Sequence, residues 1–368
     1  MKMWVLVLVW AALVLGCARG ETECADECTC TKRKASSAAK FRSNQGYVFY
    51  QHIHKAGGST LCSILARSRN VRLGANVNCN LERQMIPGNK SSTVQMRSLP
   101  VSWSLKDVER MMDQTGRNVL AAEDQPFSRM WGLSDTPMSA SMSGVDNSKW
   151  SFVTILRHPV ERILSHYKFE ELHKLTQRSV VDWAKWSPFQ GQNYMVRMFA
   201  GLVPPLLPRH YLEEVDTIWP YFDHTPPAGW DAASVPAVTR ADLEVAKRVL
   251  QRFTVVLTLD WMGECTPLLS RWLGIETEDI RARYWWGSIQ ATPKHKRKHP
   301  QRGGEFSELF ALNELDMELY EFAKGLCRCN GQKLYWRDHD EDRNDDSSCL
   351  RAHKGASEEL VARQNKDC

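Results

Sequence analysis

Several features that would assign this chain to a common class are missing from it. No glycine is followed, after four residues, by Gly-Lys-Ser or Gly-Lys-Thr, so there is no Walker A motif, and this disfavours a nucleotide kinase of the P-loop type. The N-terminal apolar run, residues 4–15, falls short of the roughly 20 residues that span a bilayer. The net charge is only +5, which does not by itself indicate a nucleic-acid partner. No internal repeat is visible in the sequence.

The bulk composition is that of a globular protein. Hydrophobic residues make up 43% of the 368 residues, with 14 Trp and 12 Phe, which is typical of a folded core. This length suits one large α/β domain with tails, or two small domains. The mild positive charge fits an enzyme that binds polyanionic cofactors or glycans.

Apolar strands alternate with amphipathic helices along the chain. We expect strands at residues 47–53, 118–123, 150–156 and 254–259. We expect helices from 61, at 104–116, from 159, and at 180–186, 192–200, 240–253, 261–273 and 308–326. Strands separated by helices predict an α/β fold: a P-loop-like parallel β-sheet flanked by helices on both faces, with ligands at the carboxyl ends of the strands.

The N-terminus has the pattern of a secretory leader. One lysine precedes the apolar run and small residues follow it, with a cleavage point near Ala18. A short uncleaved type II membrane anchor is the alternative, and either one sends the chain into the secretory pathway. The sequon Asn89-Lys90-Ser91 agrees with a glycoprotein of that pathway.

Eleven cysteines also agree with an oxidising compartment. Cys28-x-Cys30 and Cys327-x-Cys329 allow a zinc site, but one intervening residue is not the usual spacing of two to four. We therefore favour disulfides over a metal, and the sequence leaves their pairing open.

The most informative stretch is the loop after the first strand. Lys55-Ala56-Gly57-Gly58-Ser59-Thr60 joins that strand to a helical run. A strand, a glycine turn and a helix start form a nest of backbone N–H groups at the positive end of the helix dipole, which suits a phosphate or sulfate group. Lys55 adds a charge, and Ser59 and Thr60 add hydroxyl donors. The alternative is a glycine turn with no ligand.

A second anion anchor is expected where the third strand ends. Arg157 follows that strand, and Pro159 begins a helix that carries Ser165 about two turns along. Arginine is suited to a bidentate grip on phosphate. The alternative is that Arg157 only pairs with Glu161 on the surface.

These two stretches resemble the sulfotransferases that use 3′-phosphoadenosine 5′-phosphosulfate (PAPS). The loop is similar to the 5′-phosphosulfate loop of the Golgi heparan sulfate 2-O- and 6-O-sulfotransferases, roughly IPKTGGTT, with His54 for its proline and Ala56 for its first threonine. Residues 156–167 are similar to the 3′-phosphate loop LRDPVERxxSxY, with His158 for Asp. The resemblance implies that residues 55–60, Arg157 and Ser165 bind PAPS. Residues 192–200 and 313–324 are similar to two further family segments, which also fit ordinary amphipathic helices.

The resemblance also implies a general base at the end of the second strand. The heparan enzymes have histidine there and several other sulfotransferases have glutamate. Here that strand ends in Glu123-Asp124. Glu123 is the first candidate, Asp124 the second and His54 the third, with Lys55 as the catalytic cation. His52 and His158 are interpreted as structural.

The predicted organisation is a leader or anchor at 1–20, a stem at 21–45, a sulfotransferase domain at 46–330 and a polar tail at 331–368. The predicted function is O-sulfation of a glycan in the Golgi lumen, with PAPS as co-substrate, no metal and no nucleic-acid partner. A catalytically inactive glycan-binding protein, using the basic stretch 292–302 and the insertion 204–236, is an alternative. A tyrosyl-protein sulfotransferase is another.

Overall fold

The computed structural model describes residues 27–66, 68–73, 79, 81–82, 95–96, 105–123, 147–202, 235–276 and 304–337. The elements up to the third long strand are α2 (Glu27–Arg42), β1 (Tyr47–His52), α3 (Gly58–Leu65), β2 (Leu81–Glu82), β3 (Gln95–Met96), α4 (Leu105–Thr115), β4 (Val119–Glu123), the 3₁₀ turn η3 (Asn147–Lys149) and β5 (Trp150–Leu156).

The later elements are mostly helical. They are α6 (Pro159–Phe169), α7 (Leu172–Thr176), α8 (Val180–Trp186), α9 (Pro188–Gly191), α10 (Tyr194–Ala200), α12 (Arg240–Arg252), β6 (Val255–Thr258), η6 (Leu259–Trp261), α13 (Met262–Cys265), α14 (Pro267–Leu273), η8 (Gly304–Phe306), α16 (Ser307–Leu312) and α17 (Glu314–Arg337).

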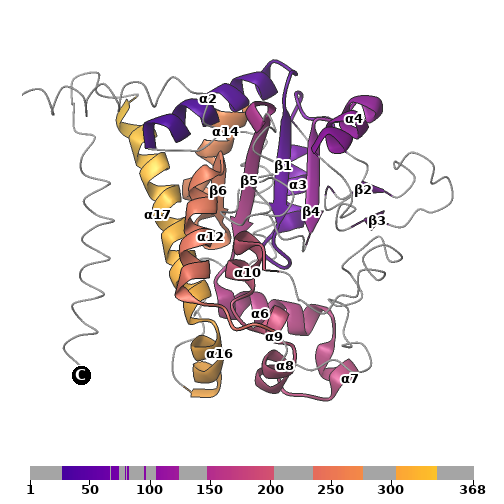
Figure 1. Cartoon of the computed structure of the whole chain (residues 1–368), viewed down its shortest axis with the longest axis vertical. Coiled ribbons are helices and arrows are strands. Elements are labelled where there is room, and N and C mark those ends of the chain that lie inside the picture. Colours follow the sequence, from indigo (N-terminus) through magenta and orange to yellow (C-terminus); the bar gives the residue numbers. More distant parts are fainter. Residues whose placement is uncertain are drawn as a thin grey trace, which may run out of the picture.

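A four-stranded sheet with the order β4-β1-β5-β6 forms the centre of the molecule (Figure 1). All of its pairings are parallel, with Val48 opposite Val119 and Val153 opposite Val255. The short strands β2 and β3 form a separate antiparallel pair. The four predicted strands are therefore confirmed as one parallel sheet, and their carboxyl ends all reach the same edge.

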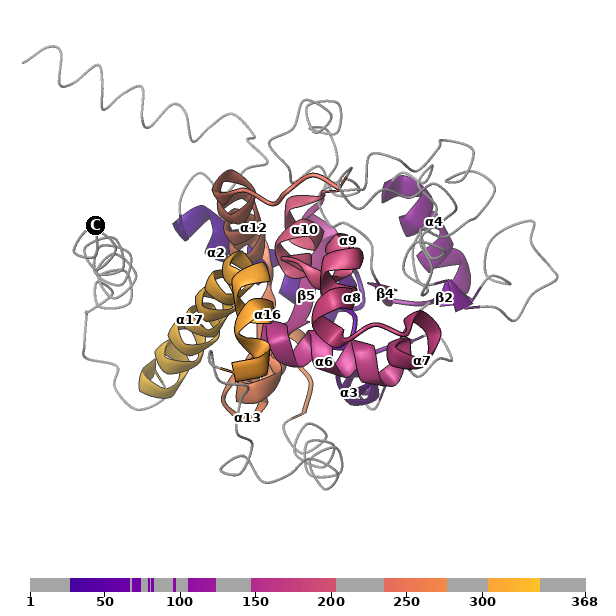
Figure 2. The same ribbon diagram turned by 90° about the horizontal axis from the view of Figure 1, so that it is seen from below.

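Alternate residues of the strands face two different helical layers. Phe49 and Phe152 pack with α4, α10, α12 and α17, while Tyr50 and Val153 pack with α3, α13 and α14. Figure 2 shows the sheet between these layers, with α12 on one side and α3 and α13 on the other. The strands are buried on both faces, as expected for a parallel sheet, and this explains their unbroken apolar character.

Two predicted helices are each divided into two. The helix expected at 261–273 breaks into α13 and α14 at Pro267, because proline has no N–H to donate to the preceding turn. The helix expected at 308–326 breaks into α16 and α17 at Asn313, whose side-chain amide donates to the carbonyls of Leu309 (3.0 Å) and Gly191 (2.9 Å). Helix α17 then continues to Arg337, into the stretch predicted as a tail.

The predicted stem needs a correction, because residues 27–42 form α2, which packs against the sheet. Ala38 and Phe41 are fully buried, with Phe41 in the cluster that contains α3 and α14. The Arg42 guanidinium donates to the carbonyls of Arg271 and Trp272, both at 3.0 Å. The segment is rich in basic and small residues and has few apolar side chains, so its helical pattern is weak. For this reason the sequence predicted a linker.

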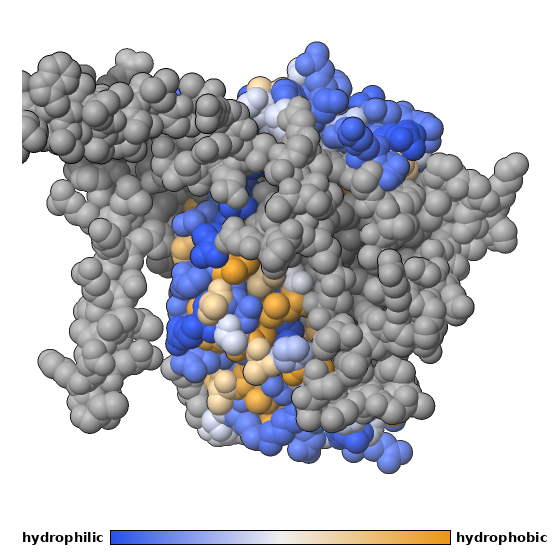
Figure 3. Space-filling view, in the orientation of Figure 1, coloured by the Kyte–Doolittle hydropathy of each residue, from blue (hydrophilic) through white to orange (hydrophobic). Residues whose placement is uncertain are grey.

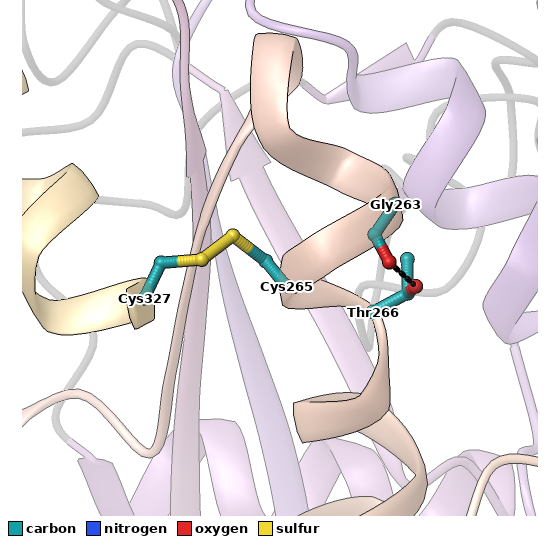
Figure 4. Close-up of a disulfide and its surroundings, with 4 residues drawn as sticks. All are labelled: Gly263, Cys265, Thr266 and Cys327. Atoms are coloured by element: carbon teal, nitrogen blue, oxygen red, sulfur yellow. Dashed lines mark hydrogen bonds between the residues drawn. A yellow bond between two sulfur atoms is a disulfide. The ribbon is translucent and has the colours of Figure 1, made fainter. Parts of the chain in front are cut away.

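Two disulfides tie helices to neighbouring segments. Cys62 of α3 is joined to Cys79. Cys265 of α13 is joined to Cys327 of α17, beside a Thr266 hydroxyl that donates to the Gly263 carbonyl (Figure 4). The preference for disulfides over zinc is therefore confirmed for Cys327.

Several predicted features lie outside the described residues. They are the leader, the sequon at Asn89, Asp124, the insertion at 204–236 except for its last two residues, the basic stretch at 292–302 and the tail beyond Arg337. Among the described residues, no helix is both long and apolar enough to cross a membrane.

Candidate active site

The loop after β1 has an unusual backbone. Lys55 has a φ of 62° and Gly57 a φ of 105°, so both lie in the left-handed region, which is costly for a lysine and easy for glycine. Gly57 is the N-cap of α3, and its carbonyl accepts hydrogen bonds from the amides of Thr60 (3.1 Å) and Leu61 (3.2 Å). A helix leaves the amides of its first turn without partners inside the helix. The loop therefore directs backbone donors toward the carboxyl edge of the sheet.

Gly58 is required by packing within the protein itself. A Cβ built on Gly58 would lie 1.8 Å from Nε2 of His52, whose side chain is buried and stacked on Tyr50. The imidazole of His52 thus supports the start of α3, in agreement with its interpretation as a structural residue. The sequence alone did not indicate that this histidine and this glycine touch.

Arg157 and Lys55 lie side by side. The Arg157 guanidinium donates to the Lys55 carbonyl at 3.3 Å and also pairs with Glu161 at 3.5 Å. Both residues follow neighbouring parallel strands, β1 and β5, on either side of the point where the strand order reverses. In open α/β sheets this switch point is where ligands bind. Arg157 therefore pairs with Glu161, as the alternative expected, but it also contacts the Lys55 loop, which that alternative did not include.

The remaining residues predicted to bind PAPS lie on the same two loops and helices. Ala56 is fully buried, Thr60 is half-buried and Ser59 is exposed at the start of α3. Ser165 is half-buried on α6, the helix that begins just after Arg157. The fold thus brings both predicted anchors to one edge of the sheet, while their roles stay predictions.

The far end of α6 completes the surroundings of Lys55, and no pattern in the sequence indicates this contact. The ammonium of Lys55 lies 3.1 Å from the centroid of the Phe169 ring, whose side chain is 66% exposed. The ring of His54 lies 4.6 Å from that of His166, and its Nε2 is 3.5 Å from a carboxylate oxygen of Glu170. Since these contacts join residues more than a hundred positions apart, no local motif encodes them.

The candidates for the general base differ in position. Glu123 is the last residue of β4, and its backbone lies opposite His52 at the same edge as the Lys55 loop. Asp124 lies outside the described residues. His54 is buried against His166 and Glu170. His158 is buried between the edges of Phe310 and Tyr320, as expected for a structural residue.

The two other segments of the resemblance, residues 192–200 and 313–324, meet each other in the interior. Asp316 accepts hydrogen bonds from the amides of Met195 (3.0 Å) and Val196 (2.8 Å), and so caps α10. The side-chain oxygen of Asn193 accepts in return from the Asp316 amide at 3.0 Å. Burial raises the pKa of Asp316 to about 6, against the opposing effect of those two amides and of the charges on Arg162 and Arg197. These hydrogen bonds join the start of α10 to α17.

The geometry agrees with the comparison with known families. Residues 41–194 match the sulfotransferase family model. The matched segment runs from the end of α2 to the start of α10 and contains both Lys55 and Arg157. No curated protein is similar to the chain at a significant level.

The match supports sulfuryl transfer in general, and it confirms the predicted fold class, a sulfotransferase α/β fold with a parallel sheet flanked by helices. Sulfotransferases of this family generally use PAPS. The finer resemblance to the heparan sulfate 2-O- and 6-O-sulfotransferases stays a prediction. Among the described residues, no group of three or more His, Cys, Asp or Glu side chains is arranged to hold a metal ion.

Proposed function

We propose that this protein is an O-sulfotransferase that uses PAPS and acts on a glycan hydroxyl in the secretory pathway. The observation that carries the proposal is the contact between the two predicted anchors. Arg157 donates to the Lys55 carbonyl at the switch point of the sheet, beside the amino end of α3. An arginine, a lysine and a helix start at one place are what a doubly anionic nucleotide needs.

Each anchor has a distinct role in this proposal. PAPS supplies the sulfuryl group and leaves as the 3′,5′-bisphosphate. The amides of Gly58 and Ser59, with the Thr60 hydroxyl, hold the 5′ end, and Lys55 neutralises the charge that develops on the leaving oxygen. Arg157 and Ser165 hold the 3′-phosphate. The ammonium of Lys55 lies over the Phe169 ring, a cation–π contact that orders this side chain.

Glu123 is proposed as the base that removes the proton of the acceptor hydroxyl. Its support is its place at the end of β4, next to β1 and therefore at the edge where Lys55 lies. A general base contributes about 10²- to 10⁴-fold to a rate. Glu123→Gln should lower transfer by that factor and leave binding of the bisphosphate product, PAP, unchanged.

The secretory compartment is supported by the leader pattern and by the two disulfides, because structural disulfides persist mainly in oxidising compartments. A shift in mobility on digestion with an N-glycosidase, lost in Asn89→Gln, would test it. The glycan acceptor is supported by the resemblance to the heparan enzymes. A protein tyrosine is the alternative acceptor.

The decisive experiment measures PAP binding by calorimetry and transfer from labelled PAPS to a panel of polysaccharides and tyrosine peptides. Lys55→Ala should lower transfer by about 10²- to 10³-fold, as expected for a lost group that stabilises the transition state. Arg157→Ala should weaken PAP binding about ten- to a hundredfold, because a charge-assisted hydrogen bond contributes about 1.5–3 kcal/mol.

Lys174→Ala and Arg110→Ala are matched controls, since both cations are exposed and lie on other helices. They should leave binding and transfer unchanged. Retention of a glycan by a wild-type protein that never binds PAP would instead favour the inactive glycan-binding alternative. Transfer from ATP that EDTA abolishes would favour a kinase.

A further inference from the structure

A cavity of about 370 Å³ lies at the opposite edge of the sheet from Lys55. It is lined by residues that precede three neighbouring parallel strands: Gly46 and Tyr47 at β1, Arg117 before β4 and Lys149 before β5. The amino ends of these strands are at the top of the sheet in Figure 1, near α4. The volume is within the range of about 300–1,000 Å³ that small-ligand sites occupy.

The walls of this cavity are held by backbone hydrogen bonds. Helices α2 and α4 both end there with a left-handed residue, Asn44 (φ 60°) and Gly116 (φ 66°). The following amides donate back into the helices, Gln45 to the Lys40 carbonyl at 2.8 Å and Arg117 to the Met112 carbonyl at 3.0 Å. This is the Schellman arrangement, which satisfies helix-terminal carbonyls.

Two more contacts fix the remaining walls. A Cβ on Gly46 would lie 2.8 Å from the Lys149 carbonyl, so the segments before β1 and β5 are in close contact. The Arg72 amide donates to the side-chain oxygen of Asn118 at 2.7 Å, which holds the segment after α3 against the start of β4. The cavity is therefore part of the folded framework.

The lining combines three cations with one carboxylate. Arg72, Arg117 and Lys149 come from three different segments, and Asp113 comes from α4. Each cation also lies near the carbonyl end of a helix or turn, where the local dipole attracts positive charge. This attraction stabilises by only about 0.3–1 kcal/mol, and it does not explain why three cations surround one cavity. Figure 3 shows hydrophilic residues gathered at this end of the molecule, over α4.

Asp113 gives the cavity a second kind of polar group. The buried phenol of Tyr47 donates a hydrogen bond to its carboxylate. Burial and the adjacent Asp113 raise the pKa of Tyr47, so the phenol keeps its proton and remains a donor. The carboxylate is thereby held at the cavity wall, where it would repel a ligand made only of phosphates. The amide side chains of Asn44 and Gln45 line the same cavity.

We propose that this cavity binds an acidic saccharide unit, with the three cations on its carboxylate or sulfate groups and Asp113, Asn44 and Gln45 on its hydroxyls. This inference rests on the proposed function, since it adds a second contact for the glycan acceptor. The length of β1 separates the cavity from the transfer end by on the order of 17 Å. Only an acceptor several sugars long reaches both places, so the site selects chains over short oligosaccharides.

The test uses a fluorescent, size-defined heparin oligosaccharide as probe, with anisotropy measured at fixed salt. The variant Arg117→Ala/Lys149→Ala should bind it at least tenfold more weakly than the wild type, because two charge-assisted contacts are lost. The control Lys106→Ala/Arg110→Ala removes the same charge from the exposed side of α4, outside the cavity, and should change binding less than twofold. Arg72→Ala is a milder third variant, since that side chain is exposed and its loss removes no core contact.

Equal weakening in both double variants, or none in the cavity variant, would overturn the inference. PAP binding is measured on the same samples and should not change in either variant. If the wild type does not bind PAP, the proposed sulfotransferase function is wrong, independently of the cavity. In that case, weaker probe binding in the cavity variant alone would still identify a saccharide site. Thermal melting of each variant shows that it is folded.

Discussion

Lys55 is the residue on which the candidate site depends most, and its backbone is held in a costly conformation. A left-handed φ costs a residue with a Cβ about 1–2 kcal/mol. The loop keeps Lys55 there through the hydrogen bond from Arg157 to its carbonyl and the contact of its ammonium with Phe169. Backbone strain of this kind concentrates at functional sites. Five other described non-glycine residues share this conformation, so the strain agrees with the proposed site but does not identify it.

Gly58→Ala is predicted to disrupt the start of α3. The added methyl group would occupy the space of the buried His52 ring, and forcing a side chain into a packed interior costs about 1–3 kcal/mol. We expect a lower midpoint of thermal unfolding and a loss of PAP binding of at least tenfold.

Ser59→Ala is the matched control for Gly58→Ala, because Ser59 is the next residue on α3 and is exposed. It should leave the unfolding midpoint unchanged. A Gly58→Ala protein with wild-type stability and PAP binding would show that His52 does not limit this position.

At the scale of elements, α10 and α17 are joined by hydrogen bonds in both directions. The Val196 amide donates to the Asp316 carboxylate, and the Asp316 amide donates to the side-chain oxygen of Asn193. These contacts give a structural reason for polar residues in the two segments that resemble family motifs. Their polar side chains accept hydrogen bonds from the amides at the starts of two helices, which have no partners inside the helix. Both helices pack in the same core cluster as β1 and β5.

Asp316 makes stability depend on pH. Its pKa is about 6 in the folded protein and 3.8 when unperturbed, so the folded state binds the proton more tightly. The free energy of unfolding should therefore fall as pH rises from about 4 to about 6, and level off above. We expect the difference in unfolding midpoint between the wild type and Asp316→Asn to shrink over this interval. A difference that stays constant over this interval would contradict the assignment to Asp316.

Helix α2 is predicted to be necessary for the fold. Phe41→Ala removes a fully buried ring between α2 and the sheet, and such truncations cost about 3–5 kcal/mol. Denaturant unfolding should show this loss, whereas Ser43→Ala, exposed at the end of the same helix, should show almost none. Equal stability of both variants would mean that α2 is a dispensable stem.

For the molecule as a whole, the two disulfides should differ in their effect. Cys265–Cys327 closes a loop of 62 residues and Cys62–Cys79 one of 17. In the chain-entropy account, the longer loop stabilises more by about 1 kcal/mol, and each bond contributes about 2–4 kcal/mol. Replacing Cys265 and Cys327 with serine should therefore lower the free energy of unfolding more than replacing Cys62 and Cys79. The reverse order in denaturant titrations would show that local packing outweighs loop length.

The parallel sheet, and the positions of Lys55 and Arg157 just after two of its strands, were predictable from the sequence, while the surroundings of these two residues were not. Residues 150–156 are apolar without a break because a central strand is buried on both faces, and this pattern is local. The contact of Lys55 with Phe169 and the burial of Phe41 join segments that are far apart in the chain or only weakly patterned. Local propensity carries no information on such pairs.

The sequence by itself determined the order of strands and helices, the glycine loop after β1 and the arginine after β5, because each depends on neighbouring residues and on short-range periodicity. Only the tertiary structure decided which cysteines pair, that α2 belongs to the core, and that three cations surround a cavity at the amino edge of the sheet. These features arise where segments that are distant in the sequence pack together, and local sequence patterns do not determine which segments those are.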